Sequence, residues 1–193
     1  MKQKVFITGI TGFAGSHLAE YLLSKNKYVI YGTYVSDKSL KNIEKIAKDI
    51  NLTKINLLDK EKTFNSISSC KPDLLFHLAA MPAVRDSYEN PGEIIVNNVL
   101  CELNILESIR KANLKECTIL IVSSADVYGK VSKKDLPINE DTPFMPTNSY
   151  AVSKIAQDFL GLQFFLSYRL NIIRARPFNH FGPRQSEGFV VGD

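Results

Sequence analysis

Tyr150 and Lys154 stand four residues apart, a spacing that puts both side chains on one face of a helix. A phenol beside an ammonium can move a proton, because the positive charge stabilises the phenolate and lowers the tyrosine pKa from about 10. Taken alone, a Tyr-x-x-x-Lys pair is usually a solvated helix face. Ser124, which closely follows a strongly apolar run at 118–122, adds a hydroxyl and makes a proton-transfer site the more specific interpretation.

A glycine-rich segment, VFITGITGFAGS at 5–16, could bind a phosphate group. Gly9 can take the tight turn that leaves a strand, Gly12 lets the backbone approach a ligand, and Gly15 lets a helix pack closely. The helix that follows turns its free N–H groups and its dipole toward an anion. The Gly-x-x-Gly-x-x-Gly spacing differs from the commonest dinucleotide fingerprint, and an ordinary turn is the alternative. The position between a strand and a helix favours a pyrophosphate site.

These groups need a scaffold that brings distant segments together, and the hydrophobic pattern predicts one. Runs of apolar and β-branched residues predict six strands, at 5–7, 28–34, 53–57, 74–78, 118–122 and 171–175. Helical periodicity predicts helices after the glycine turn, at 38–49, after a capping Asp59, at 93–111 and at 149–169. The alternation predicts a doubly wound parallel α/β sheet, in which ligands bind at the carboxyl ends of the strands.

Composition narrows the class of protein further. The 193 residues are 45% hydrophobic and 23% charged, as in a globular domain with a substantial core, and the net charge is only +4. The basic residues are dispersed, so no nucleic-acid partner is expected, and no signal peptide or membrane-spanning run is recognised. The odd set of cysteines predicts reduced thiols in a cytoplasmic protein: Cys70, Cys101 and Cys117. The histidines lack metal-ligand spacing, so no metal is expected: His17, His77 and His180.

Together the motifs resemble the extended short-chain dehydrogenase/reductases that act on nucleotide sugars, over essentially the whole chain. The matching segments are TGITGFAG at 8–15, HLAA at 77–80, Asn98, Ser124, Tyr128-Gly129, the Tyr150–Lys154 pair and 176–185. SSADVYG, LPINEDTPFMPTNSYAVSK and ARPFNHFGPRQSEGFV are most similar to the GDP-4-dehydro-6-deoxy-D-mannose reductases, whose close relatives are the GDP-mannose 4,6-dehydratases. The resemblance implies a dinucleotide-binding Rossmann domain at 1–176, with 177–193 beginning a smaller substrate domain that would continue beyond this chain.

The resemblance also implies roles for individual residues. Ser124 would hydrogen-bond the sugar carbonyl, Tyr150 would give it a proton, and Lys154 would hold the nicotinamide ribose while tuning the tyrosine. Asn179 would contact the substrate and Arg184 would lie near its diphosphate or guanosine portion; a turn asparagine and a solvated loop arginine are the alternatives. The cofactor would be held by Tyr150, Lys154 and residues of the motifs: Gly9, Thr11, Gly12, Phe13, Gly15, Thr33, Ser36, Lys38, Asn56, Leu57, Leu78, Ala79, Ala80, Asn98 and Pro177.

Asp126 bears on which reaction the resemblance implies. Dehydratases of this family carry a carboxylate at this position, usually Glu, to remove the C5 proton, and some have an Asp just before it. Here Ala125 is no acid, and Asp126 is one methylene shorter than Glu. Ketone reduction needs only the serine, tyrosine and lysine. The prediction is therefore reduction of the C4 ketone of a GDP-linked 4-keto-6-deoxyhexose, with Asp126 kept among the candidate catalytic residues. A 4,6-dehydratase, a 4-epimerase and a non-catalytic dinucleotide-sensing module are the alternatives.

The end of the second predicted strand bears on the cofactor. NAD-selective sites usually have an acid there for the ribose hydroxyls, and the match to the family puts Thr33 at that position. Ser36 and Lys38 could bind or neutralise a 2′-phosphate, while Asp37 between them complicates the case. The prediction is NADP(H), with NAD second. The expected partners are a nucleotide-sugar substrate and a second copy of the chain, paired through the helices at 93–111 and 149–169.

Overall fold

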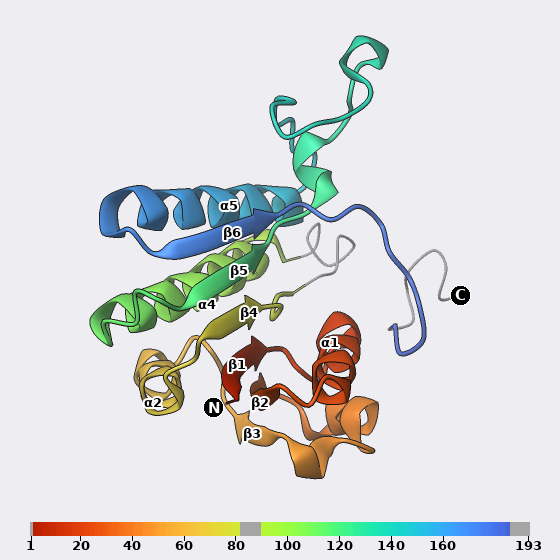
Figure 1. The fold of residues 1–193 in the computed structure, drawn as a ribbon. Coiled ribbons are helices and arrows are strands. Elements are labelled where there is room, and N and C mark those ends of the chain that lie inside the picture. The colour runs from red at the N-terminus through yellow and green to blue at the C-terminus, as the bar shows by residue number, and fades with distance from the viewer. Residues whose placement is uncertain (1, 82–89, 186–193) are drawn as a thin grey trace.

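A computed structural model describes residues 2–81 and 90–185, and it has the predicted architecture of a parallel sheet flanked by helices (Figure 1). Six strands lie in the order β3-β2-β1-β4-β5-β6, and every neighbouring pair is parallel. This is the strand order of a dinucleotide-binding Rossmann fold. The strands are β1 (Gln3–Thr8), β2 (Tyr28–Tyr34), β3 (Asn51–Lys54), β4 (Leu74–His77), β5 (Thr118–Val122) and β6 (Asn171–Ala175). The helices are α1 (Phe13–Ser24), α2 (Lys60–Cys70), α4 (Pro91–Lys111) and α5 (Ser149–Tyr168). Short 3₁₀ segments are η1 (Asp37–Ile43), η2 (Ala47–Asp49), η3 (Ala125–Tyr128) and η4 (Lys133–Asp135).

The core lies on both faces of the sheet, because successive side chains of a strand point to opposite sides. On β1, Val5 and Ile7 pack in one cluster with α1 and η1, whereas Phe6 packs in the other with α2, α4 and α5. Both faces are therefore covered, which explains why the central strands are almost wholly apolar. Four strands and the helix α5 match the predicted bounds to within one residue: β2, β4, β5, β6 and α5. The predicted fold class is confirmed.

The segment at 38–49 is not the predicted helix but the two short 3₁₀ segments η1 and η2. Its apolar residues Leu40, Ile43 and Ile46 recur every three positions, which matches the three residues per turn of a 3₁₀ helix. The next strand is also displaced, since β3 spans Asn51–Lys54 instead of the predicted 53–57. Ile55 and Leu57 are buried in the core beyond the strand end, so their apolar character reflects packing and not sheet pairing.

A capping residue in the sequence fixes the start of α2. Asp59 caps α2 as predicted, with its carboxylate accepting a hydrogen bond from the Lys62 amide at 3.0 Å.

The three cysteines are unpaired and buried. In the described ranges, no helix is long and apolar enough to cross a bilayer. Of the predicted start of a substrate domain at 177–193, the last residues, 186–193, lie outside the described residues, and that division of the chain stays a prediction.

Candidate active site

The glycine turn joins β1 to α1, and its backbone conformation explains two of the three glycines. Gly9 has φ +66°, in the left-handed region, and a Cβ there would lie 2.9 Å from the Cα of Ala79. At Gly15 a Cβ would lie 2.3 Å from the Gly9 carbonyl oxygen, so only glycine lets α1 approach the turn so closely. Both positions have the roles that the sequence predicted for them.

Gly12, the N-cap residue of α1, is exposed and has no side chain with which to cap the helix. Among the residues that the structure describes, no side-chain cap is seen at the N-terminus of α1, and its first turn carries no acid. The N–H groups at this end are therefore available to an anion, and the helix dipole favours negative charge there. An exposed glycine and an uncapped helix start are what a dinucleotide pyrophosphate needs, so the residues present fit this group.

The HLAA motif lies directly beside the glycine turn. The hydroxyl of Thr8 accepts hydrogen bonds from the amides of Leu78 and Ala79, both at 3.1 Å, and shares a hydrogen bond with Nδ1 of His77 at 2.8 Å. Burial lowers the pKa of His77 to about 3, helped by the nearby positive charge of Lys154, so its imidazole is neutral. This histidine is a buried structural residue that fixes the chain after β4 against the glycine turn.

Asn98 lies fully buried on α4 and holds the same segment from the other side. Its side-chain oxygen accepts from the Met81 amide at 2.8 Å, and its amide donates to the Ser153 hydroxyl at 3.0 Å. Gln157 of α5 donates to the Asn98 backbone carbonyl at 3.0 Å. The side chain of Asn98 is thus engaged by the protein, and it ties α4, α5 and the chain after β4 together.

Ser124 and Asp126 follow β5 at the same edge of the sheet. Ser124 is the N-cap of η3, and its hydroxyl accepts a hydrogen bond from the Asp126 amide at 3.2 Å. The amide of Ala125 donates to the carbonyl of Pro177, just after β6, at 3.0 Å. These two bonds fix the turn that presents Ser124 at the end of the sheet.

Helix α5 carries the predicted proton-transfer pair in its first turns. Asn148 caps the helix by accepting from the Ala151 amide at 2.7 Å. The hydroxyl of Ser123 donates to the backbone carbonyl of Lys154 at 3.2 Å, which fastens the helix to the end of β5. The Lys154 ammonium lies 5.8 Å from the centre of the Tyr150 ring, so the two side chains share one face as predicted.

The electrostatic state of the pair differs from the prediction. Burial raises the pKa of Tyr150; contact with the Ser124 hydroxyl opposes the rise, and the nearby Asp126 carboxylate adds to it. The predicted lowering is not found in this structure, because burial dominates the pKa of Tyr150 and the Lys154 ammonium donates to the Val122 carbonyl at 2.9 Å. The structure nevertheless brings Ser124, Asp126, Tyr150 and Lys154 together at the end of β5.

The residues predicted to select the cofactor lie around the end of β2. Thr33 is only 2% exposed, whereas Ser36 and Lys38 are exposed on the following loop. The Asp37 carboxylate forms an ion pair with Lys54 at the end of β3. The acid that complicated the prediction therefore already has a cationic partner.

Two further predicted cofactor residues after β3 and one of the glycine turn have structural contacts. Leu57 belongs to the hydrophobic core and is not a surface beside a ligand, whereas Asn56 is exposed and its side chain accepts from the Leu58 amide at 3.0 Å. The Thr11 hydroxyl pairs with that of Ser39 at 2.8 Å. The role of Leu57 in holding the cofactor stays a prediction, and in this structure its side chain packs in the core.

Arg184 lies against α1. Its guanidinium binds both carboxylate oxygens of Glu20 at 2.8 Å, the Asn42 carbonyl at 3.0 Å and Nδ1 of His17 at 2.7 Å. In the described part of the chain no hydrogen bond joins it to Ser124, Tyr150 or Lys154. The arginine anchors the segment after β6 to α1 and η1. Its predicted contact with the substrate stays a prediction.

The rest of that segment passes over the glycine turn. His180 stacks on Phe13 with a centroid separation of 5.8 Å, while Asn179 is exposed. Figure 1 shows the segment after β6 running from the end of the sheet toward α1. Phe13 therefore serves as a contact surface for this segment in the described structure.

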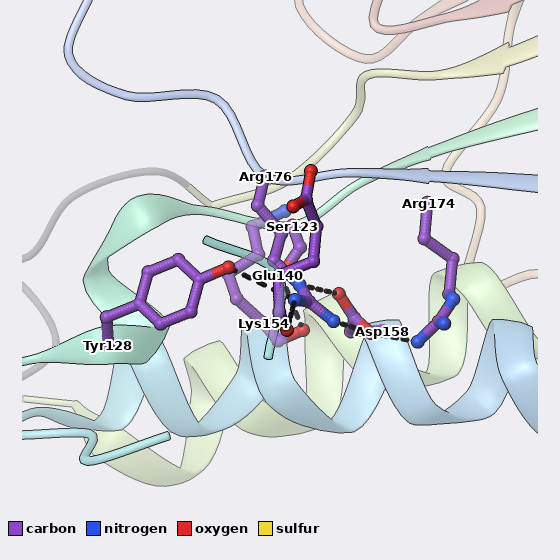
Figure 2. A network of polar contacts seen from close by, with 7 residues as sticks. All are labelled: Ser123, Tyr128, Glu140, Lys154, Asp158, Arg174 and Arg176. Atoms are coloured by element: carbon purple, nitrogen blue, oxygen red, sulfur yellow. Dashed lines mark hydrogen bonds and ion pairs between the residues drawn. The ribbon is translucent and has the colours of Figure 1, made fainter. Parts of the chain in front are cut away.

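A charged network that the sequence reasoning missed supports the catalytic edge (Figure 2). Asp158 of α5 is fully buried and pairs with Arg174 and Arg176 of the β6 segment. Arg176 also donates to the Tyr128 hydroxyl at 3.1 Å and to the Glu140 carbonyl at 3.0 Å. The network connects α5, η3 and the long loop before α5, so it holds the turn that carries Ser124. No local signal in the sequence indicates this network, because Asp158 looks like an ordinary acid of a mixed-polarity helix and its partners lie 16 and 18 residues further along the chain.

Comparison with known proteins places this geometry in a family. Residues 6–192 match the family described as GDP-mannose 4,6 dehydratase. The chain is 34% identical over 191 residues to the GDP-6-deoxy-D-mannose reductase of Pseudomonas aeruginosa, covering 99% of this chain and 57% of that protein. It thus spans little more than half the length of that relative.

Solved structures agree with the sequence comparison. The structure of RMD from Pseudomonas aeruginosa complexed with NADPH matches with a TM-score of 0.77 and 31% identity, over 99% of this chain and 57% of that one. The dTDP-glucose 4,6-dehydratase of Bacillus anthracis in complex with NAD matches with a TM-score of 0.86 and 25% identity, over 98% and 59%. Proteins with this fold therefore include one bound to NADPH and one bound to NAD.

Proposed function

We propose, from the premise that the chain belongs to the GDP-mannose 4,6-dehydratase family, that it forms the cofactor-binding and catalytic part of a nucleotide-sugar reductase. The dehydratases, reductases and epimerases of this extended short-chain dehydrogenase/reductase group are NAD(P)-dependent oxidoreductases. The proposed reaction is reduction of the C4 ketone of a GDP-linked 4-keto-6-deoxyhexose, with NADPH as the reductant.

The observation that carries the choice of a reductase is the residue set after β5. Ser124 and Tyr150 supply a hydrogen-bond donor and a proton for a carbonyl oxygen, which is what ketone reduction requires. Dehydration also needs a base for C5 and an acid for C6. Ala125 supplies neither, and Asp126 is a short carboxylate on a turn fixed through its own amide. The same Asp126 is the observation that keeps a dehydratase as the second candidate.

The glycine turn and the start of α1 would hold the dinucleotide pyrophosphate, and Lys154 would hold the nicotinamide ribose. The bound nicotinamide supplies the hydride for C4. Tyr150 then gives its proton to the oxygen that becomes the alcohol, and Lys154 stabilises the phenolate left behind. Burial of Tyr150 and Lys154 limits competing exchange with water during this transfer.

An assay with two substrates tests the proposal. The protein is incubated with NADPH and a preformed GDP-4-keto-6-deoxyhexose, and in parallel with GDP-mannose and no added reductant. We expect NADPH oxidation in the first reaction and no comparable formation of keto sugar in the second. Keto-sugar formation from GDP-mannose at a similar rate would instead identify a dehydratase. NADPH binding by the full-length protein without turnover on any keto sugar would identify a sensing module.

We expect the chain to bind NADPH more tightly than NADH, because no free acid faces the end of β2. Thr33→Asp should reduce this preference by roughly tenfold, about 1.4 kcal/mol, since a carboxylate repels a 2′-phosphate and accepts from a 2′-hydroxyl. Calorimetric titration with both cofactors measures the ratio. Thr33→Val, which removes the hydroxyl and adds no charge, is the matched control and should keep the preference. Equal affinities in the unmodified chain contradict the assignment of NADPH.

We also propose a homodimer formed through α4 and α5, which lie side by side on one face of the sheet (Figure 1). Both helices expose large apolar side chains: Val96, Leu100, Val152, Phe159, Phe165 and Leu166. A face of this kind favours association with another apolar surface. Sedimentation equilibrium should give twice the 21.7 kDa mass of the chain, and a monomer at micromolar concentration would contradict the proposal.

A further inference from the structure

Glu102 of α4 is a buried acid for which the reaction proposed above has no use. It is 0% exposed, and neither carboxylate oxygen has a hydrogen-bond partner in the described part of the chain. Burying a carboxyl group without a donor costs free energy, because the interior does not replace its hydration. A polar group kept at such a position calls for a compensating interaction with a charge nearby.

The fold places Glu102 against α5. It follows Asn98 by one helical turn on α4, and the Asn98 side chain donates to Ser153 of α5 at 3.0 Å. Lys154, the next residue of α5, is only 4% exposed, and the hydrogen bond of its ammonium goes to a neutral acceptor, the Val122 carbonyl. The Lys154 ammonium and the Glu102 carboxylate are therefore both buried in the layer between α4 and α5. In the described part of the chain, neither is hydrogen-bonded to a group of opposite charge.

We propose that Glu102 is the counter-ion of Lys154. Its carboxylate stabilises the protonated form of the lysine, and the ammonium of Lys154 binds the cofactor. Glu102 is in this sense a positioning residue. This proposal deepens the proposed function, because it assumes that Lys154 acts on a bound dinucleotide. Glu102 itself touches neither cofactor nor substrate and acts only through the lysine.

The charges of the surrounding elements agree with this pairing. Burial lowers the pKa of Lys154 to about 8, and the Glu102 carboxylate opposes that change. Burial likewise raises the pKa of Glu102; Lys154 and the neighbouring Gln157 side chain oppose this rise, and the charge of Asp158 adds to it. From β4, His77 contributes no charge because it is neutral. From α5, Tyr150 is uncharged while its proton is in place, and Asp158 is already paired.

The partners of Asp158 are Arg174 of β6 and Arg176, the residue that follows this strand; they bind its two carboxylate oxygens (Figure 2). Its negative charge is therefore balanced by cations other than Lys154. That leaves Glu102 as the buried acid in this layer whose charge is free to balance the lysine.

The direct test is a titration of Lys154 by NMR, with lysine labelled at the ε carbon and the Lys154 signal assigned by its loss in Lys154→Met. Glu102→Gln removes the charge and keeps the shape of the side chain. We expect the titration midpoint of Lys154 to fall by roughly one pH unit, because an ammonium without its counter-ion gives up its proton more readily. An unchanged midpoint overturns the proposal.

Two controls isolate the effect. Glu107→Gln removes a carboxylate from the same helix, but Glu107 pairs with Lys60 and Lys111 at the surface, so the Lys154 midpoint should stay where it is. Glu102→Leu replaces the acid by an apolar group and should lower the Lys154 midpoint by the same amount as Glu102→Gln. It also provides the test if Glu102→Gln fails to fold. A midpoint that stays unchanged in the folded Glu102→Leu variant also overturns the proposal.

A second readout separates this proposal from the proposed function. NADPH affinity, measured from pH 6 to pH 9, should weaken roughly fivefold at pH 8 in Glu102→Gln and change little at pH 6, where Lys154 is protonated in both proteins. A shifted midpoint in a chain that binds no NADPH would support the counter-ion and contradict the proposed function. Normal NADPH binding at every pH in the variant, with an unshifted midpoint, would contradict the counter-ion alone.

Discussion

Replacing Tyr150 by phenylalanine is expected to lower the rate of sugar reduction by about a hundredfold to ten-thousandfold, the usual contribution of a positioned general acid. The variant loses the phenolic proton and keeps the aromatic ring. Tyr150 is partly buried, and the phenyl ring that remains keeps its packing, so the structure should be preserved. Single-turnover measurement of NADPH oxidation with a saturating keto sugar would give this rate.

The reason for expecting a loss in turnover and not in binding lies in the arrangement of α5. Lys154 is fastened independently of Tyr150, through its own ammonium and the Val122 carbonyl. NADPH affinity should therefore change less than twofold in Tyr150→Phe, whereas Lys154→Met should damage affinity and turnover together. Tyr168→Phe, a phenol-to-phenyl change at the exposed end of the same helix, is the matched control and should be neutral. Full activity in Tyr150→Phe would remove the tyrosine from the proposed mechanism.

Much of the fold could be predicted because local and global signals agree. The apolar runs of β2, β5 and β6 are bounded by residues that end strands, and α5 begins where Asn148 caps it. The failures have a common cause. At 38–49 and 53–57 the apolar residues indicate that these segments are buried. Burial alone does not distinguish an α-helix from a 3₁₀ helix, nor a strand from a loop that packs on the core.

The candidate site was predictable where chemistry depends on residue type and spacing, as for the glycine turn and the Tyr150–Lys154 pair. It was less predictable where a side chain acts through tertiary partners. In the sequence, Asp158 and Glu102 look like ordinary acids on a helix surface. They are buried only because α5 packs against α4 and β6. Likewise, nothing local in the sequence indicates that Arg184 binds Glu20, because 164 residues separate the two.

Gly12→Val is expected to weaken NADPH binding by about a hundredfold or more, about 3 kcal/mol, while leaving the fold nearly unchanged. Among the three glycines of the turn, this one separates binding from folding. Gly9 needs its positive φ, and Gly15 has no room for a Cβ. Gly12 has φ −75° and ψ 178°, which valine adopts readily, and the added Cβ would meet only the Gly9 carbonyl oxygen at 3.2 Å. The rest of the side chain would project into the exposed space before α1.

That space is where a pyrophosphate would meet the uncapped start of α1, so valine would displace the anion from the N–H groups that bind it. Calorimetry with NADPH measures the loss, and thermal unfolding checks that the melting temperature stays within a few degrees of the unmodified chain. Gly92→Val is the matched control: Gly92 also lies at the start of a helix, and among residues 2–81 and 90–185 a Cβ there would meet nothing within 4 Å. The control should bind NADPH normally. If Gly12→Val also binds NADPH normally, the glycine turn serves only to connect β1 to α1, and the dinucleotide must be held elsewhere.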